Sequence, residues 1–278
     1  MRNALTLSFA MLLGAVSACG PAEPTPVAIP FRAAVNGAAF ACDASYDGIG
    51  TTASTIRPID MRVYAHDIHV LAGGERVPLT LTDGPAQGNG IALLDFEDDS
   101  GTCETGSPTT HTVIEGTVPA DTVVDGVSFK LGVPEDQNHL DAATSPAPLN
   151  VPGLWWSWSG GYKFAKIDVA STGNSEFFFH LGATDCAGDP VAGFACAFGN
   201  LAQVEVEGLA EDGAVVLDIG ALYEGVDVDA PLAEGDSVPG CMAFPGDPEC
   251  PAMFAPVGLE FESTSAAGAQ RLFAAGAK

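Results

Sequence analysis

The sequence has few basic residues and no long apolar run beyond its N-terminus. It contains 10 Lys and Arg against 36 Asp and Glu, which gives a net charge of −26. Between Lys166 and Arg271 there is neither lysine nor arginine. A surface of this sign repels phosphate backbones and anionic headgroups, so nucleic-acid binding is excluded. A cation or a basic protein partner remains compatible with it.

Enzyme signatures are also missing. The sequence has no H-E-x-x-H, no G-x-S-x-G and no phosphate-cradling glycine loop. It has no C-x-x-C-H for covalent haem and no C-x-x-C pair for a thiolate metal site. We therefore expect no c-type haem attached to this chain in the usual way.

The N-terminus predicts export. Arg2 precedes an apolar stretch from Ala4 to Val16, and small residues then lead into Cys19. This order indicates a lipoprotein signal peptide over residues 1–18, with Cys19 as the lipidated first residue of the mature chain. The alternative is an ordinary secretory signal that is cleaved nearby. We expect a protein anchored by lipid to the outer membrane or to the periplasmic face of a bacterial membrane.

Residues 19–30 follow the signal and are rich in proline, which predicts an extended tether after the lipidated cysteine. Residues 31–278 are then long enough for a single domain with one core.

The cysteines other than Cys19 are even in number, and an exported protein with such a set is expected to form disulfides. Short spacings favour Cys186–Cys196 and Cys241–Cys250, which leaves Cys42–Cys103 by elimination.

Short apolar runs separated by Gly, Pro, Asn and Asp predict an all-β fold. Gly73 and Gly74 predict a hairpin turn, and a short helical turn is expected near Ala266–Phe273. The architecture predicted is an antiparallel β-sandwich with long ordered loops. Its expected strands are Phe31–Val35, Ile59–Leu71, Val77–Leu81, Ile91–Phe96, His111–Val118, Gly126–Gly132, Lys163–Val169, Glu176–Leu181, Leu201–Glu207 and Val215–Ile219.

The segment 133–162 has no regular pattern, yet it holds His139 and all the tryptophans, Trp155, Trp156 and Trp158. Long loops without secondary structure are functional or disordered, and the aromatic content argues for order. We expect this loop to pack on a sheet and to form a metal or redox site. In an extended segment Trp156 and Trp158 would share a face, and Trp155 would oppose them.

Histidine is the commonest protein ligand for a metal. His66 and His69 are three residues apart, so in a regular strand they would point to opposite faces, and at most one could join a given site unless a bulge intervenes. His180 would share a face with Phe178, and a lone strand histidine is more often structural than a ligand. His139 lies two residues before Asp141, whose carboxylate could orient its ring.

The acidic run from Asp95 to Asp99 lacks the ligand spacing and the central glycine of a calcium loop. We interpret it as a solvated turn.

Several segments in order resemble the MbnP-like family, the exported copper-binding proteins first named from methanobactin operons. Each segment is weakly specific alone, but together they span nearly the whole mature domain. They are FRAAVNGAAFACD, MRVYAHDIHVL, IALLDFEDDSGTC, SFKLGVPEDQNHLD, SPAPLN, WWSWSGGYKFAKID, FFFHLGATDC and GCMAFPGDPEC.

The resemblance implies an accessory copper-binding protein, not an enzyme, whose partner is a MauG-type diheme cytochrome c peroxidase. Such a partner can oxidise a tryptophan to kynurenine, and related proteins hold copper through two histidines and this kynurenine. His66 and His139 match the family's histidines most clearly, and His180 also matches. The chain has Ala86 where many members carry a tryptophan, which leaves the three loop tryptophans as candidates.

The alternative hypothesis is a metal-free module whose acidic face docks a periplasmic redox partner.

Overall fold

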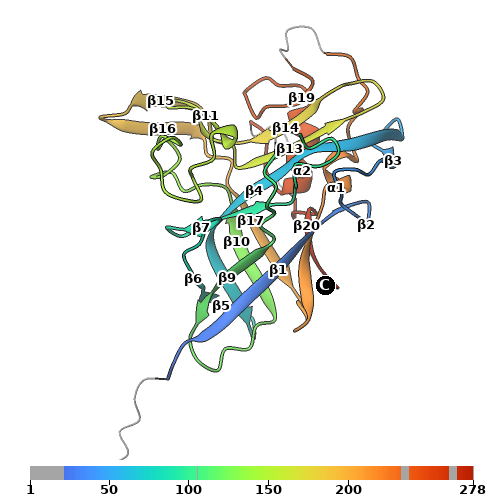
Figure 1. The fold of residues 1–278 in the computed structure, drawn as a ribbon. Coiled ribbons are helices and arrows are strands. Elements are labelled where there is room, and N and C mark those ends of the chain that lie inside the picture. Colours follow the sequence, from blue (N-terminus) through green and yellow to red (C-terminus); the bar gives the residue numbers. More distant parts are fainter. Residues whose placement is uncertain (1–21, 105, 233–237, 263–267, 278) are drawn as a thin grey trace, which may run out of the picture.

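The computed structural model describes residues 22–104, 106–232, 238–262 and 268–277 (Figure 1). Two β-sheets cross and pack face to face, so the predicted all-β sandwich is confirmed. The predicted signal peptide and the lipidated Cys19 lie outside the described residues and stay predictions. No helix in the described part of the chain has the length and apolar character that a membrane span requires.

The smaller sheet contains both ends of the described chain. β1 pairs with β18 in parallel, and its other neighbours are antiparallel. In spatial order this sheet consists of β20 (Phe273–Ala277), β18 (Gly213–Asp218), β1 (Thr25–Val35), β9 (Val113–Val118) and β6 (Thr80–Leu81), with β2 (Ala38–Ala39) beside β1.

The larger sheet is built around the long strand β4 (Ser54–Ala72), which is buried along most of its length. Its spatial order is β17 (Ala202–Glu207), β10 (Gly126–Leu131), β4, β13 (Ala165–Ala170), β14 (Phe177–Leu181) and β19 (Gly240–Cys241). Also joined to it are β3 (Tyr46–Ile49), β5 (Glu75–Pro78), β8 (Ile91–Asp95) and, through β8, β7 (Gln87–Gly88).

The remaining elements are short. Two hairpins are separate from the main sheets, and the described helices all belong to the C-terminal half of the sequence. They are β11 (Trp155–Ser157) with β12 (Gly161–Tyr162), β15 (Thr184–Asp189) with β16 (Gly193–Phe198), the 3-10 helix η1 (Pro152–Leu154), α1 (Gly220–Tyr223) and α2 (Cys250–Val257).

Aromatic rings from both sheets form the centre of the core. Phe129 of β10 is fully buried and meets Phe31 of β1 edge-on, with the ring centroids 6.0 Å apart. It also meets Phe273 of β20 at 5.3 Å. Alternation explains this placement, because every second residue of a strand points to the same face. The core therefore lies between the sheets and leaves the outer face of the larger sheet available for a site.

Each predicted strand overlaps an observed one, but the predicted extent of the tether and the predicted C-terminal helical turn are wrong. The expected tether is part of the fold from Thr25 onward, because Thr25 to Pro30 pair with β9. Proline is tolerated there because a strand residue needs its N–H only on the hydrogen-bonded side. No helix occurs in the described residues of the Ala266–Phe273 segment, and α2 instead begins at Cys250.

The predicted turn and cross-links are present. Gly73 and Gly74 have φ values of 60° and 85° and join β4 to β5 as a two-residue hairpin turn. The three disulfides are Cys42–Cys103, Cys186–Cys196 and Cys241–Cys250, as predicted.

Candidate metal centre

The segment 133–162 covers the outer face of the larger sheet, as expected of an ordered loop. The buried hydroxyl of Tyr64, on β4, donates to the Pro148 carbonyl oxygen at 3.1 Å. The Tyr162 hydroxyl donates to the Leu149 carbonyl oxygen at 2.8 Å. The two tyrosine rings meet edge-on at 6.0 Å. This aromatic clamp fixes the loop over the histidine-bearing strand.

His139 lies at the edge of this loop, against the hairpin β15–β16. Its Nδ1 is 2.7 Å from the Trp158 carbonyl oxygen, so Nδ1 carries the proton and donates it there. Nε2 is then an acceptor: the Asn138 side-chain amide donates to it at 3.3 Å, and Cys196 Sγ lies 3.4 Å away. Phe194 stacks on the ring, with the centroids 4.5 Å apart. Asp141 does not orient the ring, because the Trp158 carbonyl does so.

His66 is buried on β4 and is oriented in the same way. Its Nδ1 lies 2.9 Å from the Gly132 carbonyl oxygen, which leaves Nε2 unprotonated. Burial lowers the pKa of His66, and nearby Lys130 acts in the same direction. The imidazole is therefore neutral at pH 7, the state that binds a metal. His66 thus bonds Gly132, the residue directly before the 133–162 loop, and His139 lies within that loop.

The expectation that His66 and His69 face opposite sides is wrong. Across the ladder to β10, His66 lies opposite Lys130 and His69 lies opposite Ser128. Ser128 and Lys130 are two residues apart and share a face, so the histidines share one as well. The cause is a bulge at Asp67, whose φ is 51°.

His180 is oriented by a carboxylate. Its Nε2 is 2.9 Å from Asp168 Oδ1, and in the described structure its buried Nδ1 has no hydrogen-bond partner. Burial lowers the pKa of His180 despite the opposing charge of Asp168. As predicted, the ring shares a face with Phe178, at a centroid distance of 5.2 Å.

His180 does not join His66. Through β13 it is in register with Arg62, two strands away and four residues before His66 on β4. Strand spacing and rise put the two Cα atoms roughly 16 Å apart, which is too far for two imidazoles on one ion.

A buried ionic network surrounds Asp168 on this face. Asp60 accepts from Arg62 Nε at 2.9 Å and contacts Lys166 Nζ through its other oxygen. Lys166 also lies 3.2 Å from Asp168. Burial disfavours the charge of Lys166, but the two carboxylates outweigh it and raise its pKa. Each buried charge thus has an opposite partner, as a dry interior demands.

The tryptophans are not arranged as an extended strand predicts. Trp155 and Trp158 contact each other edge-on at 5.7 Å, because the chain turns after Ser157. Trp156 instead lies over His180, at a centroid distance of 6.5 Å, and beside Phe244 at 5.7 Å. Trp158 is the most exposed of the three, at 45%.

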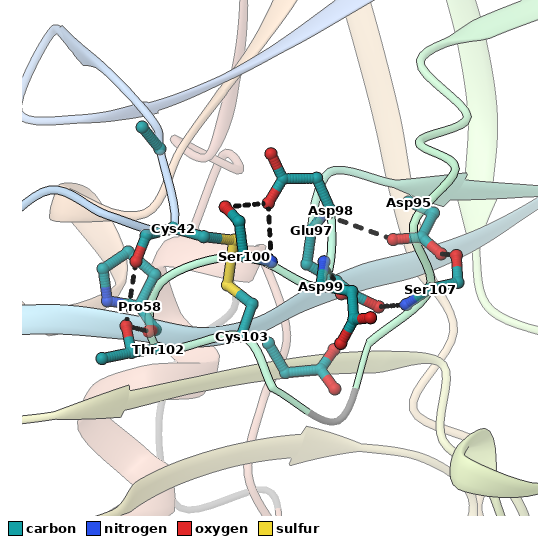
Figure 2. Close-up of a disulfide and its surroundings, with 12 residues drawn as sticks. Cys42, Pro58, Asp95, Glu97, Asp98, Asp99, Ser100, Thr102, Cys103 and Ser107 are labelled. Carbon is teal, nitrogen blue, oxygen red and sulfur yellow. Dashed lines mark hydrogen bonds between the residues drawn. A yellow bond between two sulfur atoms is a disulfide. The ribbon is translucent and has the colours of Figure 1, made fainter.

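The acidic run is not wholly a solvated turn (Figure 2). Asp98 and Asp99 are exposed, but Glu97 is fully buried, 3.5 Å from Arg62 Nη1, and Asp95 is 3% exposed. Burial, together with the charge of Glu97, raises the pKa of Asp95 to about 7. The run therefore joins the buried network at one end and meets solvent at the other.

Substitution Asp95→Asn should flatten the pH dependence of stability. From about pH 4 to pH 7 the folded protein keeps a proton that the unfolded chain has lost, given the ordinary pKa of 3.8. The free energy of unfolding therefore falls as pH rises through this window, by up to about 1.4 kcal/mol per unit. Urea unfolding across the window measures the slope, with Asp98→Asn as the control for loss of a surface charge. An unchanged slope in Asp95→Asn would exclude this source.

Two groups of potential ligands meet in the described structure. They are His139 with Cys186 and Cys196, and Asp247 with Cys241 and Cys250, and the ligand atoms of each group lie within 4.8 Å of one another. In both groups the cysteines form a disulfide, so their sulfurs are not thiolates here. Sequence reasoning predicted the Cys186–Cys196 disulfide from its short spacing but did not place His139 beside it. The available signal was the position of both cysteines shortly after the FHLG segment.

These observations define a class: a disulfide-linked β-sandwich in which a tryptophan-rich loop covers one sheet and adjoins two oriented histidines. The sequence matches the MbnP family over residues 24–243, and the chain belongs to that family. Its structure is similar to the solved structure of MbnP from Methylosinus trichosporium, with 25% identity and a TM-score of 0.80. The match covers 92% of this chain and 99% of that one. No curated protein matches the sequence.

Proposed function

We propose that this protein is an exported copper-binding protein in which His66 and His139 hold the ion. The observation that carries the proposal is the shared orientation of these side chains. In each, Nδ1 donates to a backbone carbonyl, at 2.9 Å for His66 and 2.7 Å for His139, so Nε2 presents its lone pair. Metal-binding histidines are usually fixed in this way by a bond from the other ring nitrogen.

The charge around these histidines also favours a cation. Asp136 acts electrostatically on His66 and lines the same pocket as His139, together with Glu135 and Asp141. Imidazole suits copper, and a bound copper ion would supply Lewis acidity or one-electron chemistry here. The residues of this chain would orient the two imidazoles and keep His66 neutral.

Copper uptake tests the assignment. The mature chain should bind about one copper per molecule, as two oriented imidazoles define one site. His66→Ala and His139→Ala should each lose most of it, measured by elemental analysis and by electron paramagnetic resonance after Cu²⁺ loading.

His69→Ala is the matched control, because this histidine is partly exposed and its Nδ1 bonds the Asp67 carbonyl nearby. Unchanged copper content in both test variants would refute the assignment. No uptake by the parent chain would leave the metal-free docking module as the better account.

We further propose that a MauG-type diheme peroxidase is the partner and oxidises a tryptophan among Trp155, Trp156 and Trp158 to kynurenine. The protein would then be a substrate and binding protein, not an enzyme itself. Ala86 is 8% exposed and offers only a methyl group where many relatives carry the tryptophan. Trp156 is favoured, because it lies beside Phe244, which is 48% exposed and gives an aromatic path to the surface.

Co-expression with the peroxidase should produce a chain that has gained one oxygen atom and lost one carbon atom, because the formyl group of the first oxidation product leaves as formate with the second oxygen. Intact mass and peptide mapping locate the change, and Trp156→Phe should abolish it if Trp156 is the site. An unmodified peptide over residues 155–158 beside an active peroxidase would contradict the proposal.

The localisation we propose is export with a lipid anchor on Cys19. The three disulfides support an oxidising compartment, where such bonds persist.

A further inference from the structure

The Cys186–Cys196 disulfide differs from the other two in its exposure. Both of its cysteines are partly exposed, whereas those of the other disulfides are 3% exposed or less. It links β15 to β16, a hairpin that projects from the body of the molecule beside β11 (Figure 1). A reductant can therefore reach this bond while the other two are shielded.

The strand ladder holds these two cysteines together even without their bond. Cys186 lies directly opposite Cys196, and the pairing continues on both sides, from Thr184 with Phe198 to Asp189 with Gly193. Directly opposed residues of an antiparallel pair have Cβ atoms about 4.5–5.5 Å apart. Two thiols at this separation can bind one ion.

His139 supplies a third ligand atom at the same place. Its Nε2 is 3.4 Å from Cys196 Sγ, and the three ligand atoms lie within 4.8 Å of one another. The Trp158 carbonyl holds Nδ1, and Phe194 of the hairpin stacks on the ring. Nε2 is therefore held beside the disulfide in a fixed orientation, and a metal ion there would replace the hydrogen bond that it accepts from the Asn138 amide.

We propose that this disulfide masks an alternative metal site, in which Cys186, Cys196 and His139 bind Cu(I) after reduction. Because His139 has only Nε2 to offer, this site takes His139 from the copper site of the function proposed above, on which the inference rests. A dithiol reductant gives two electrons and two protons: the S–S bond breaks, two S–H bonds form, and the reductant becomes a disulfide. Cu(I) then binds both sulfurs as thiolates, and their two protons pass to solvent.

The ligand set selects the metal. Two thiolates and one imidazole form a soft site, which suits Cu(I) or zinc. Structural zinc sites use four protein ligands, and in the described part of the chain no fourth His, Cys, Asp or Glu joins this group. A pocket of about 800 Å³ adjoins the group, lined by His139, Phe194, Glu135 and Asp136 among others, and gives a cation an acidic entrance.

The test uses the mature chain, treated with a small dithiol and freed of it by anaerobic gel filtration. Alkylation and peptide mapping should find thiols at Cys186 and Cys196 before any appear at the buried pairs. Cu(I), supplied as its bicinchoninate complex, should then bind at one equivalent per chain, with thiolate-to-copper charge-transfer absorption. The oxidised chain should not show this absorption.

Cys186→Ser/Cys196→Ser is the matched control for any thiol released elsewhere, and it should lose the thiolate-to-copper absorption. His139→Ala should bind Cu(I) at least about tenfold more weakly, since it lacks one ligand. His66→Ala should keep this site, although it loses the copper of the oxidised protein under the function proposed above. Failure of that function therefore appears in the oxidised chain, and failure of the masked site in the reduced one. The same thiolate-to-copper absorption in the double variant, or earlier reduction of the buried pairs, would overturn the inference.

Discussion

Substitution Asp60→Asn should lower the free energy of unfolding by about 3 kcal/mol, the cost of breaking a buried ion pair. Asp60 is 1% exposed and bonds two cations on neighbouring strands, Arg62 and Lys166. Asparagine keeps the shape and removes the charge. Among the described residues, the ion-pair partners that remain are Glu97 at 3.5 Å from Arg62 and Asp168 at 3.2 Å from Lys166. Each buried cation would then keep one carboxylate partner instead of two.

Urea denaturation measures this effect as a shift of the midpoint. The control is Glu224→Gln, which removes the partner of Arg271 in a pair whose side chains are 54% and 65% exposed. Such surface pairs contribute less than about 1 kcal/mol, so the control should unfold near the parent midpoint. Equal shifts in the two variants would mean that the network adds nothing beyond ordinary surface charge.

Alternation of apolar residues was enough to locate the main strands, but it could not reveal this network. Asp60 and Arg62 alternate with apolar residues along β4, and in such a pattern the polar residues are normally assigned to the solvent face. The loop 133–162 covers that face, and a cover contributed by a distant segment leaves no periodic signal. The hairpin β15–β16 was missed for a related reason: it is largely exposed, so it lacks the apolar pattern of a packed strand.

The candidate site was only partly predictable. His139 and His66 could be chosen from their neighbours in sequence. The groups that orient them are backbone carbonyls, which every residue has, so the sequence does not indicate which carbonyl is used. The bulge at Asp67 reverses the face of every later side chain on β4, so His69 could not be placed by counting. The turn after Ser157 separates Trp156 from Trp158 in the same way.

The disulfides were predictable because sequence separation limits which cysteines can meet, and their separations also rank their effects on stability. Cys42–Cys103 spans 61 residues, whereas Cys186–Cys196 spans 10. A cross-link stabilises mainly by restricting the unfolded chain, and the restriction grows with the loop that it closes. The longer loop corresponds to about 4 kcal/mol and the shorter one to slightly less than about 3 kcal/mol.

Cys42→Ala/Cys103→Ala should therefore be the most destabilised of the disulfide variants with a comparable native structure. Thr102 beside the bond donates from N and from Oγ1 to the Cys42 carbonyl oxygen, both at 3.0 Å (Figure 2). These bonds keep the acidic loop docked in the folded state, so the loss arises chiefly in the unfolded chain. Urea unfolding should show a lower midpoint than in Cys186→Ala/Cys196→Ala, with a larger slope because the unfolded chain expands. If Cys42→Ala/Cys103→Ala lost less free energy of unfolding than Cys186→Ala/Cys196→Ala, the disulfides would stabilise mainly through contacts in the folded state and not by restricting the unfolded chain.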